Sequence, residues 1–130
     1  MIKTRVVLVE DDSITAYAIQ KMLENLDYAV IDTFVSGEDT LDKISILDPD
    51  IILMDITLKG KINGIETAAV INKKFGIPII YLTANTNYDT IQKAKETTKS
   101  YGYLLKPVRG IDLHWTINTA LKRHKLEGSV

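Results

Sequence analysis

Length, charge and cysteine content narrow the class of protein before any motif is considered. The chain has 130 residues and a net charge of −1, so it can form one domain and lacks the basic excess of a nucleic-acid-binding surface. Cysteine is absent, which excludes disulfides and thiolate metal sites, and no apolar run approaches the roughly 20 residues of a membrane span. We expect a cytoplasmic protein with a single domain at 1–126 and a short tail at 127–130.

Five short apolar runs, rich in β-branched residues, predict five β-strands. Most of the runs are continuous rather than alternating, which is typical of strands buried on both faces of a parallel sheet. The second run is more mixed, which favours a position nearer the edge of the sheet. The predicted strands are residues 5–9, 28–34, 51–54, 78–82 and 101–105.

Helical patterns lie between these strands. The first helix follows a cap at Asp12 or Ser13, the second ends before Pro49, and the third follows Asn63. The fourth, at 88–98, is short and polar. We expect the first helix to bury Ile14, Ala18, Met22 and Leu26, the second to bury Leu41, Ile44 and Leu47, and the fifth to bury Leu113, Ile117, Ala120, Leu121 and His124. Five alternating βα units predict an α/β fold with a doubly wound parallel sheet and helices on both faces.

Chemically useful side chains follow four of the predicted strands. In open α/β sheets, ligands bind beyond the carboxyl ends of the strands, so these residues are expected to converge on one edge. They are Glu10, Asp11 and Asp12 after the first strand, Asp55 at the end of the third, Thr83 after the fourth and Lys106 after the fifth.

These residue types together favour phosphoryl transfer. Crowded carboxylates repel one another, and a cation such as Mg²⁺ relieves that repulsion while also binding phosphate. A carboxylate can act as a covalent nucleophile that forms an aspartyl phosphate. A lysine and a hydroxyl can bind the phosphoryl oxygens. The set predicts metal-assisted transfer of a phosphoryl group to a carboxylate.

Each member of the set also has an ordinary structural explanation. Asp12 is a typical helix cap, and an aspartate after a buried strand is commonly one as well. Thr83 alone would be a plain strand-end residue, and Lys106 before a proline would be an exposed loop lysine. The functional interpretation depends on all of them occurring at the same ends of the strands.

The chain resembles the receiver domain of two-component response regulators. The resemblance is carried by Glu10-Asp11 after 6–9, Asp55 within 53–56, Gly64 within 63–66, Thr83-Ala84 and Lys106-Pro107. It implies the flavodoxin-like (βα)5 fold with strand order 2-1-3-4-5. It also implies a phospho-accepting signalling switch, not a turnover enzyme, that receives its phosphoryl group from a histidine kinase or a phosphotransfer protein.

The resemblance assigns expected roles to the residues of the site. Asp55 would be the phosphoacceptor, Asp11 a direct Mg²⁺ ligand, Glu10 a ligand acting through water, and Thr57 the donor of a backbone carbonyl to the metal. Lys106 would pair with the phosphoryl oxygens.

A second group of residues would respond to phosphorylation. Thr83 would move its hydroxyl onto the phosphoryl group, and Tyr103 stands where the family keeps an aromatic switch residue. The bond before Pro107 would be cis. Asn85 would flank the phosphoryl pocket with an uncharged side chain, as Thr57 does.

Some positions depart from the family pattern, and other classes of protein deserve comparison. The loop from Asp55 to Gly64 is one residue longer than usual, and Asn63 replaces a frequent aspartate. An aspartate-nucleophile phosphatase would need a second aspartate where Thr57 stands. A flavodoxin-type flavin module would not place the acids at 10–12 against a phosphate. A degenerate receiver that only docks partners is disfavoured by the intact acids, Thr83 and Lys106.

We expect the signal to leave through the face formed by the fourth helix, the fifth strand and the fifth helix. Trp115 lies outside the buried stripe of the fifth helix and is a candidate interface anchor, because aromatic residues dominate interface hot spots. The alternative is that Trp115 folds over its own fifth strand. The resemblance implies partner docking or homodimerisation upon activation. The net charge and the lack of a long apolar run argue against a nucleic-acid or membrane partner. Whether the chain acts alone or as part of a longer protein stays open.

Overall fold

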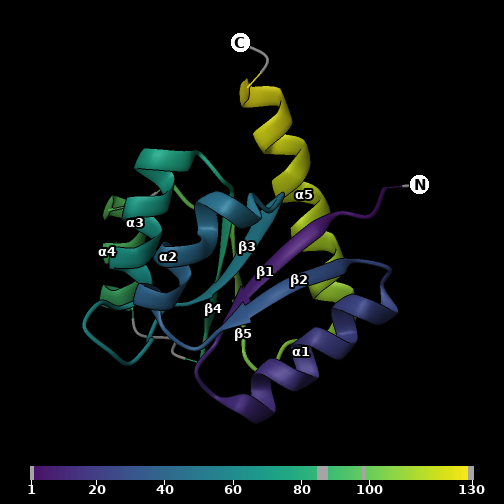
Figure 1. The fold of residues 1–130 in the computed structure, drawn as a ribbon, viewed down its shortest axis with the longest axis horizontal. Helices are drawn as coiled ribbons and strands as arrows, with labels where there is room; N and C mark the ends of the chain where they lie inside the picture. The colour runs from purple at the N-terminus through teal and green to yellow at the C-terminus, as the bar shows by residue number, and fades with distance from the viewer. Residues whose placement is uncertain (1, 85–87, 98, 129–130) are drawn as a thin grey trace.

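A five-stranded parallel sheet lies between two layers of helices in the computed structural model, which describes residues 2–84, 88–97 and 99–128 (Figure 1). The sheet order is β2-β1-β3-β4-β5, and each pair of neighbours is parallel, as predicted. The strands are β1 (Arg5–Val9), β2 (Ala29–Phe34), β3 (Ile51–Asp55), β4 (Ile79–Thr83) and β5 (Gly102–Leu105). The helices are α1 (Ser13–Asn25), α2 (Gly37–Leu47), α3 (Gly64–Phe75), α4 (Tyr88–Thr97) and α5 (Gly110–Gly128).

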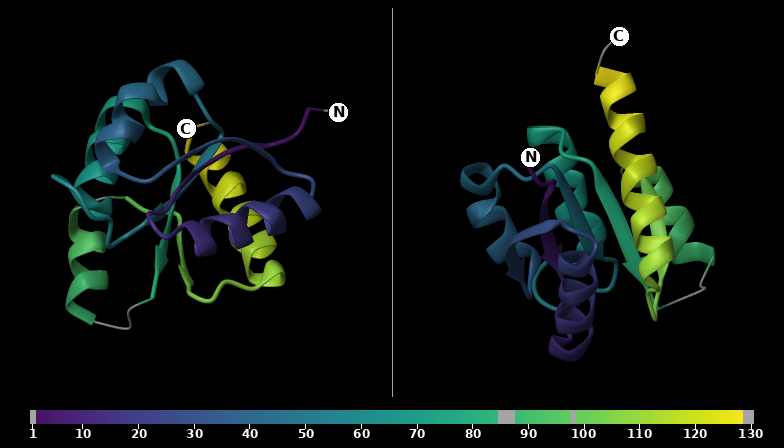
Figure 2. Two further views of the ribbon diagram at one scale, coloured as in Figure 1. Left: turned by 60° about the horizontal axis from the view of Figure 1, so that its bottom comes forward. Right: turned by 90° about the vertical axis from the view of Figure 1, so that its right-hand side faces the viewer.

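The helices divide between the two faces of the sheet (Figure 2). The core on one face contains Ile19 and Leu23 of α1 with Leu113 and Ile117 of α5. The core on the opposite face combines residues of α2, α3 and α4, among them Ile44, Ala68, Ile71 and Ala94. The alternation of β and α units produces this arrangement, because right-handed crossovers place successive helices according to the order of the strands.

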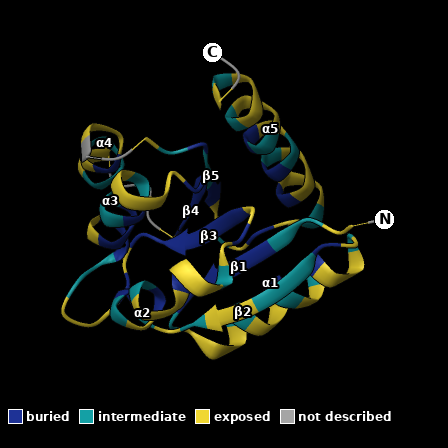
Figure 3. Ribbon diagram, turned by 45° about the horizontal axis from the view of Figure 1, so that its top comes forward, coloured by how far each residue is buried: buried dark blue, intermediate teal, exposed yellow. Residues whose placement is uncertain are grey.

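Burial falls from the centre of the sheet to its edges (Figure 3). Every residue of β3 and β4 is buried, whereas β2 has only intermediate and exposed positions and β5 combines one buried residue with intermediate and exposed ones. A central strand packs helices against both faces, so both sets of alternating side chains must be apolar. The continuous apolar runs therefore identified the central strands correctly, and the mixed second run identified an edge strand.

The predicted buried stripe of α1 is wrong. Ile14 is 80% exposed and Ala18 is exposed, whereas Ile19 and Leu23 are buried. A spacing of four residues advances about 40° beyond a full turn at each step, so such a stripe winds away from the core. Met22 and Leu26 are partly buried and pack against the core beside the true stripe.

Local caps position the helices that follow the strands. Asp12 is the N-cap of α1 and accepts a hydrogen bond from Thr15 N–H at 3.1 Å. Asn63 and Glu66 form a reciprocal capping box at the start of α3. Asp48 ends α2 in the left-handed conformation, immediately before Pro49.

The last helix extends further than the sequence indicated. Glu127, expected in the tail, lies within α5 and accepts bonds from Lys99 at 2.6 Å, Tyr101 at 2.7 Å and Arg123 at 3.0 Å. Lys99 and Arg123 also lie over the Tyr101 ring. These four residues form the Glu127 cluster, which joins the end of α5 to the start of β5. Among the described helices, none is long and apolar enough to span a membrane.

Candidate functional site

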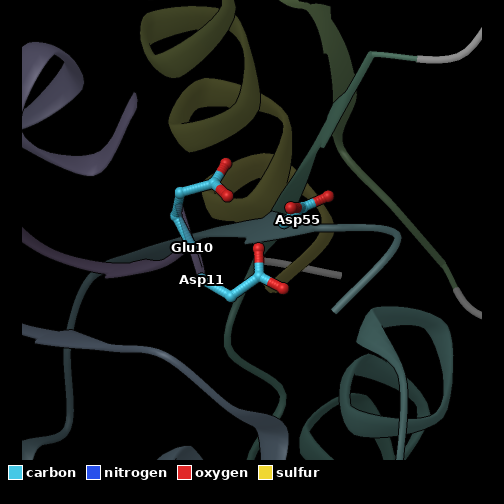
Figure 4. Close-up of side chains that lie close together, drawn as sticks. All are labelled: Glu10, Asp11 and Asp55. Atoms are coloured by element: carbon cyan, nitrogen blue, oxygen red, sulfur yellow. The ribbon is translucent and has the colours of Figure 1, made fainter. Parts of the chain in front are cut away.

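Three carboxylates meet at the carboxyl ends of β1 and β3 (Figure 4). Glu10, Asp11 and Asp55 each present an oxygen, and these oxygens lie within 4.8 Å of one another. The two strands are hydrogen-bonded neighbours, with Val9 opposite Met54, so residues that follow β1 lie beside the end of β3. Glu10 and Asp55 are each only 2% exposed. The structure therefore brings together three of the four acids that the sequence placed at this edge, and the fourth, Asp12, caps α1.

Lys106 completes the acidic site, which consists of Glu10, Asp11, Asp55 and this lysine. Its ammonium bonds to Asp55 Oδ2 at 3.0 Å and contacts the Glu10 carboxylate. Burial raises the pKa of Glu10 to about 7, even though the bond to Lys106 opposes the rise. Burial would lower the pKa of Lys106, but its bonds to Glu10 and Asp55 outweigh that effect, so its pKa is raised. Three acids against one cation leave an excess of buried negative charge.

The excess charge and the donor chemistry fit a hard divalent cation. Mg²⁺ is bound in proteins by one or two carboxylates and keeps several waters, and oxygen is its preferred ligand atom. Burial raises the pKa of the Glu10 carboxyl, with a smaller contribution from the neighbouring Asp55, and a bound cation would favour its charged form. Among the described residues, Glu10, Asp11 and Asp55 are the group whose geometry could hold a metal.

The backbone around Asp55 explains why glycine begins α3. A Cβ on Gly64 would lie 1.9 Å from the carbonyl oxygen of Asp55, an overlap that no side chain can relieve. Gly64 N–H donates to Ile56 O at 3.2 Å, so the first turn of α3 packs directly on the chain that leaves β3. Glycine at position 64 is therefore required by close packing against the backbone of Asp55.

Thr57 bonds to the Asp55 carboxylate in a way that the sequence did not indicate. Its N–H and its hydroxyl both donate to Asp55 Oδ1, at 3.0 and 3.2 Å. These two donors orient the carboxylate while Lys106 holds the other oxygen. The expected role of the Thr57 carbonyl in metal binding stays a prediction.

Thr83 and Tyr103 lie on neighbouring strands near the acidic site. Thr83 ends β4 and is 3% exposed. Tyr103 lies opposite Tyr81 and stacks on its ring at 5.7 Å between centroids, with Lys95 Nζ 5.9 Å from the Tyr103 ring centre. The Tyr103 hydroxyl is buried and has no hydrogen-bond partner among the described residues.

The remaining expected residues are distributed as follows. The Lys106–Pro107 peptide bond is cis, as the resemblance implied, and Lys106 N–H donates to Thr83 O at 2.8 Å. Trp115 is 68% exposed, so it does not fold over its own strand, although it borders a hollow beside Tyr101 and Tyr103. Asn85 and Thr98 lie outside the described residues.

Sequence reasoning missed two contacts made by the loop between β3 and α3. Lys59 N–H donates to Asp11 Oδ2 at 3.2 Å, and Ile62 N–H donates to Glu38 Oε1 at 3.0 Å. A backbone donor leaves no trace in residue type, because any residue except proline carries it. The only hint in the sequence was the extra residue in this loop, which indicates that the path of its backbone differs from the usual one.

The fold and the site define the class of protein. The family model described as the response regulator receiver domain matches residues 6–118, and the chain belongs to this family. Receiver domains are regulatory domains of two-component signalling.

Particular relatives agree with this class. The chain is 28% identical over 130 residues to the transcriptional regulatory protein PdtaR of Mycobacterium tuberculosis, covering 97% of this chain and 62% of that protein. It is 31% identical over 124 residues to the DNA-binding response regulator MtrA of the same species, covering 94% and 52%. The chain thus spans about half to three fifths of the length of these curated relatives.

Solved structures show the same architecture. The signal receiver domain of a modulated diguanylate cyclase from Desulfovibrio desulfuricans G20 is similar with a TM-score of 0.91 and 38% identity, over 97% of this chain and 99% of that one. The N-terminal domain of a response regulator/sensory box/GGDEF 3-domain protein from Carboxydothermus hydrogenoformans has a TM-score of 0.87 and 30% identity, over 95% and 98%.

Proposed function

We propose that the chain is a phosphorylation switch that accepts a phosphoryl group on Asp55 from a phosphohistidine of a histidine kinase or phosphotransfer protein. The observation that carries the proposal is the acidic site: Asp55 is buried beside Glu10 and Asp11, and Lys106 contacts its carboxylate. A buried excess of carboxylates suits a site whose working state contains a cation and a phosphoryl group.

The chemistry is a single in-line transfer. A carboxylate oxygen of Asp55 forms a bond to phosphorus while the bond from phosphorus to the donor nitrogen breaks, and that nitrogen keeps the electron pair. Thr57 N–H and Lys106 hold the Asp55 carboxylate in place, and Lys106 can move with the transferred oxygens. Bound Mg²⁺, held by Asp11 and Asp55 with Glu10 close by, would offset the charge on the phosphoryl oxygens.

Self-phosphorylation followed by hydrolysis would be the extent of catalysis. A phosphatase that turns over would need a second acid near the nucleophile, and the position two residues after Asp55 holds Thr57, which bonds to the carboxylate instead. A flavin site is disfavoured because the acids at the end of β1 would repel a phosphate directly. These features favour regulation over turnover. A cytoplasmic location is part of the same proposal.

A change at Thr83 and Tyr103 would report the phosphoryl group to the surface. The group adds about −1.5 to −2 charges and strong acceptor oxygens, which the Thr83 hydroxyl can approach. Movement of Thr83 would free space for the Tyr103 ring, whose buried hydroxyl bonds to none of the described residues. Favouring the active state tenfold needs a differential interaction of only about 1.4 kcal/mol.

The output surface would be the face of α4, β5 and α5. Ala94 is the buried residue of α4 among those whose burial is described, so α4 can shift at low cost. Trp115 is a large apolar side chain exposed on α5, and it could anchor a partner or a second copy of the chain. The net charge of −1 gives this domain no general attraction to nucleic acid.

The direct test is the intact mass of the protein after treatment with acetyl phosphate and Mg²⁺. The wild type should gain one phosphoryl group, and Asp55→Asn should gain none, because an amide is not a nucleophile of comparable strength. Asp12→Asn is a matched control that changes an acid at the same edge of the sheet but keeps a good helix cap. An adduct that persists in Asp55→Asn would contradict the proposal.

A further inference from the structure

The loop between β3 and α3 forms one wall of the acidic site and bonds two of its carboxylates through backbone N–H groups. Lys59 N–H donates to Asp11 Oδ2 at 3.2 Å, and Thr57 N–H donates to Asp55 Oδ1 at 3.0 Å. Because these donors belong to the chain itself, the path of the loop sets the orientation of both carboxylates. A residue that fixes the position of the loop therefore also fixes the orientation of these two carboxylates.

Glu38, in the first turn of α2, holds the far end of this loop. Its Oε1 accepts the Ile62 N–H at 3.0 Å, although 24 positions separate the two residues in the sequence. Its carboxylate also lies against the turn of the loop at Gly60, where a Cβ would be 3.0 Å from Glu38 Oε2. Gly60 has a φ of 123°, a conformation that residues with side chains rarely adopt. Glu38 thus meets the loop where its backbone is most unusual.

Close packing connects the anchored end of the loop to the acceptor residue. A Cβ on Gly37 would lie 1.9 Å from Thr67 Oγ1 and 2.9 Å from Ile62 Cγ1, so α2 and α3 are in near contact around the Ile62 side chain. At the start of α3, Gly64 lies against the carbonyl of Asp55. Neither contact leaves room for a methyl group. A displacement of the end of the loop would therefore also shift the backbone at Asp55, because there is no free space in which the loop could move alone.

We propose that Glu38 is a positioning residue for the cation site. By accepting the Ile62 N–H, it holds the loop in the path that places the Lys59 N–H on Asp11 and the Thr57 N–H on Asp55. This inference rests on the proposed function, since it concerns the same site. Mutually repelling carboxylates bind a cation better when they are already oriented, because less ordering is required upon binding.

A simpler explanation would be that Glu38 only stabilises α2. Acidic residues in the first turn of a helix interact favourably with the helix dipole, and Asp39 shares that turn. The difference that matters is the contact with the loop. Glu38 accepts a hydrogen bond from it, whereas Asp39, the next residue of the helix, is exposed. Asp39→Ala is therefore a matched control that removes the same charge from the same turn.

The experiment compares wild type, Glu38→Ala, Glu38→Gln and Asp39→Ala as full chains. Mg²⁺ is titrated while amide NMR signals of Asp11 and Lys59 are followed, and thermal unfolding is recorded without the metal. We expect Glu38→Ala to weaken Mg²⁺ binding by about 3- to 10-fold, below the loss typical of groups that contact metal ligands directly. Glu38→Gln should bind nearly as wild type, because its amide oxygen can still accept the Ile62 N–H. Asp39→Ala should be unchanged in Mg²⁺ affinity.

The outcomes separate this inference from the proposed function. If the wild type binds Mg²⁺ and Glu38→Ala binds it equally well, Glu38 is not a positioning residue, and the proposed function stands. The same rejection follows if Asp39→Ala is weakened as much, since the effect would then come from charge. If the wild type itself binds no Mg²⁺, both the proposed function and the role of Glu38 fail. Faster amide exchange at Lys59 in Glu38→Ala, without metal, would support the tether independently.

Discussion

Two clusters of carboxylates and cations lie near opposite ends of β5, and they differ in charge balance and in burial. In the acidic site, three carboxylates lie together with one lysine that contacts two of them, Glu10 and Asp55, and burial raises the pKa of Glu10 to about 7. In the Glu127 cluster, one carboxylate receives bonds from Lys99, Tyr101 and Arg123, and these bonds, that of Lys99 foremost, lower the pKa of Glu127 to about 2. The carboxylate of the second cluster is compensated by two cations, whereas the first cluster has one cation for three carboxylates.

The comparison teaches that geometry alone does not identify a functional site. Both clusters contain short hydrogen bonds and ion pairs between residues distant in sequence. A satisfied exposed ion pair contributes little and has no reason to bind anything else. Uncompensated like charges in a buried site are costly in free energy unless a ligand of opposite charge binds. Such a site is therefore a candidate for ligand binding. Four variants or conditions would break or sharpen this contrast.

The largest expected effect is on Mg²⁺ affinity. Asp11→Asn removes a carboxylate that would bind the metal directly. The loss of affinity should therefore reach or exceed the loss of about 10- to 100-fold that is typical when a residue bonded to a metal ligand is mutated. Glu127→Gln removes one acid from the satisfied cluster and should leave Mg²⁺ affinity unchanged. Amide NMR titration measures both. Equal binding by Asp11→Asn and wild type would show that the acids at the strand ends do not hold the cation.

The next effect is the pH dependence of that affinity. A proton on Glu10 competes with the cation, so Mg²⁺ binding should weaken by up to about tenfold per pH unit as pH falls below about 7, where Glu10 takes up its proton. Glu10→Gln should bind more weakly but with a flatter pH profile between 5.5 and 7.5. A profile equally steep in wild type and Glu10→Gln would mean that another group carries the competing proton.

A smaller effect is expected on stability without metal, with opposite signs in the two clusters. The pKa of Glu10 is raised on folding, so its contribution to stability is present below pH about 4.5 and is lost as pH rises through about 7. The pKa of Glu127 is lowered, so its contribution is present above about 4.5 and is lost as pH falls toward about 2. Denaturant unfolding of Glu10→Gln and Glu127→Gln across this range should give difference curves of opposite slope. Parallel curves would remove the distinction drawn between the clusters.

The smallest expected effect on stability comes from Trp115, which borders a hollow shared with Tyr101 of the Glu127 cluster. Because its side chain is 68% exposed, Trp115→Ala should change the free energy of unfolding by no more than about 0.5 kcal/mol. Leu113→Ala, at a fully buried position two residues earlier, should cost about 2–5 kcal/mol.

Sedimentation with and without beryllofluoride, which mimics the phosphoryl group, then tests Trp115 as an interface anchor. Self-association of the wild type that is lost in Trp115→Ala would support this role. Self-association that is equal in both would exclude Trp115 as the anchor. If neither protein associates, capture of a cognate kinase by wild type and by Trp115→Ala would decide whether the face binds a different partner.

The amino-acid sequence by itself determined the order of elements, the central strands and the membership of the acidic site. Continuous apolar runs can only be buried on both faces, and parallel strands place their carboxyl ends at one edge, so Glu10, Asp11 and Asp55 had to converge. The sequence also marked Asn63-Gly64 as the start of the third helix, whereas the capping box and the close packing that explain these residues came from the structure.

Only the tertiary structure decided which face of α1 is buried, how far α5 extends and what holds the loop beside Asp55. Ile14 is exposed because packing against α5 and β2 fixes the rotation of α1, and several apolar spacings along one helix fit the sequence equally well. The bonds from Lys59 and Ile62 use backbone donors that every residue except proline possesses, so Asp11 and Glu38 gain partners that no sequence pattern specifies. The raised pKa of Glu10 likewise follows from burial, which exists only once the chain is folded.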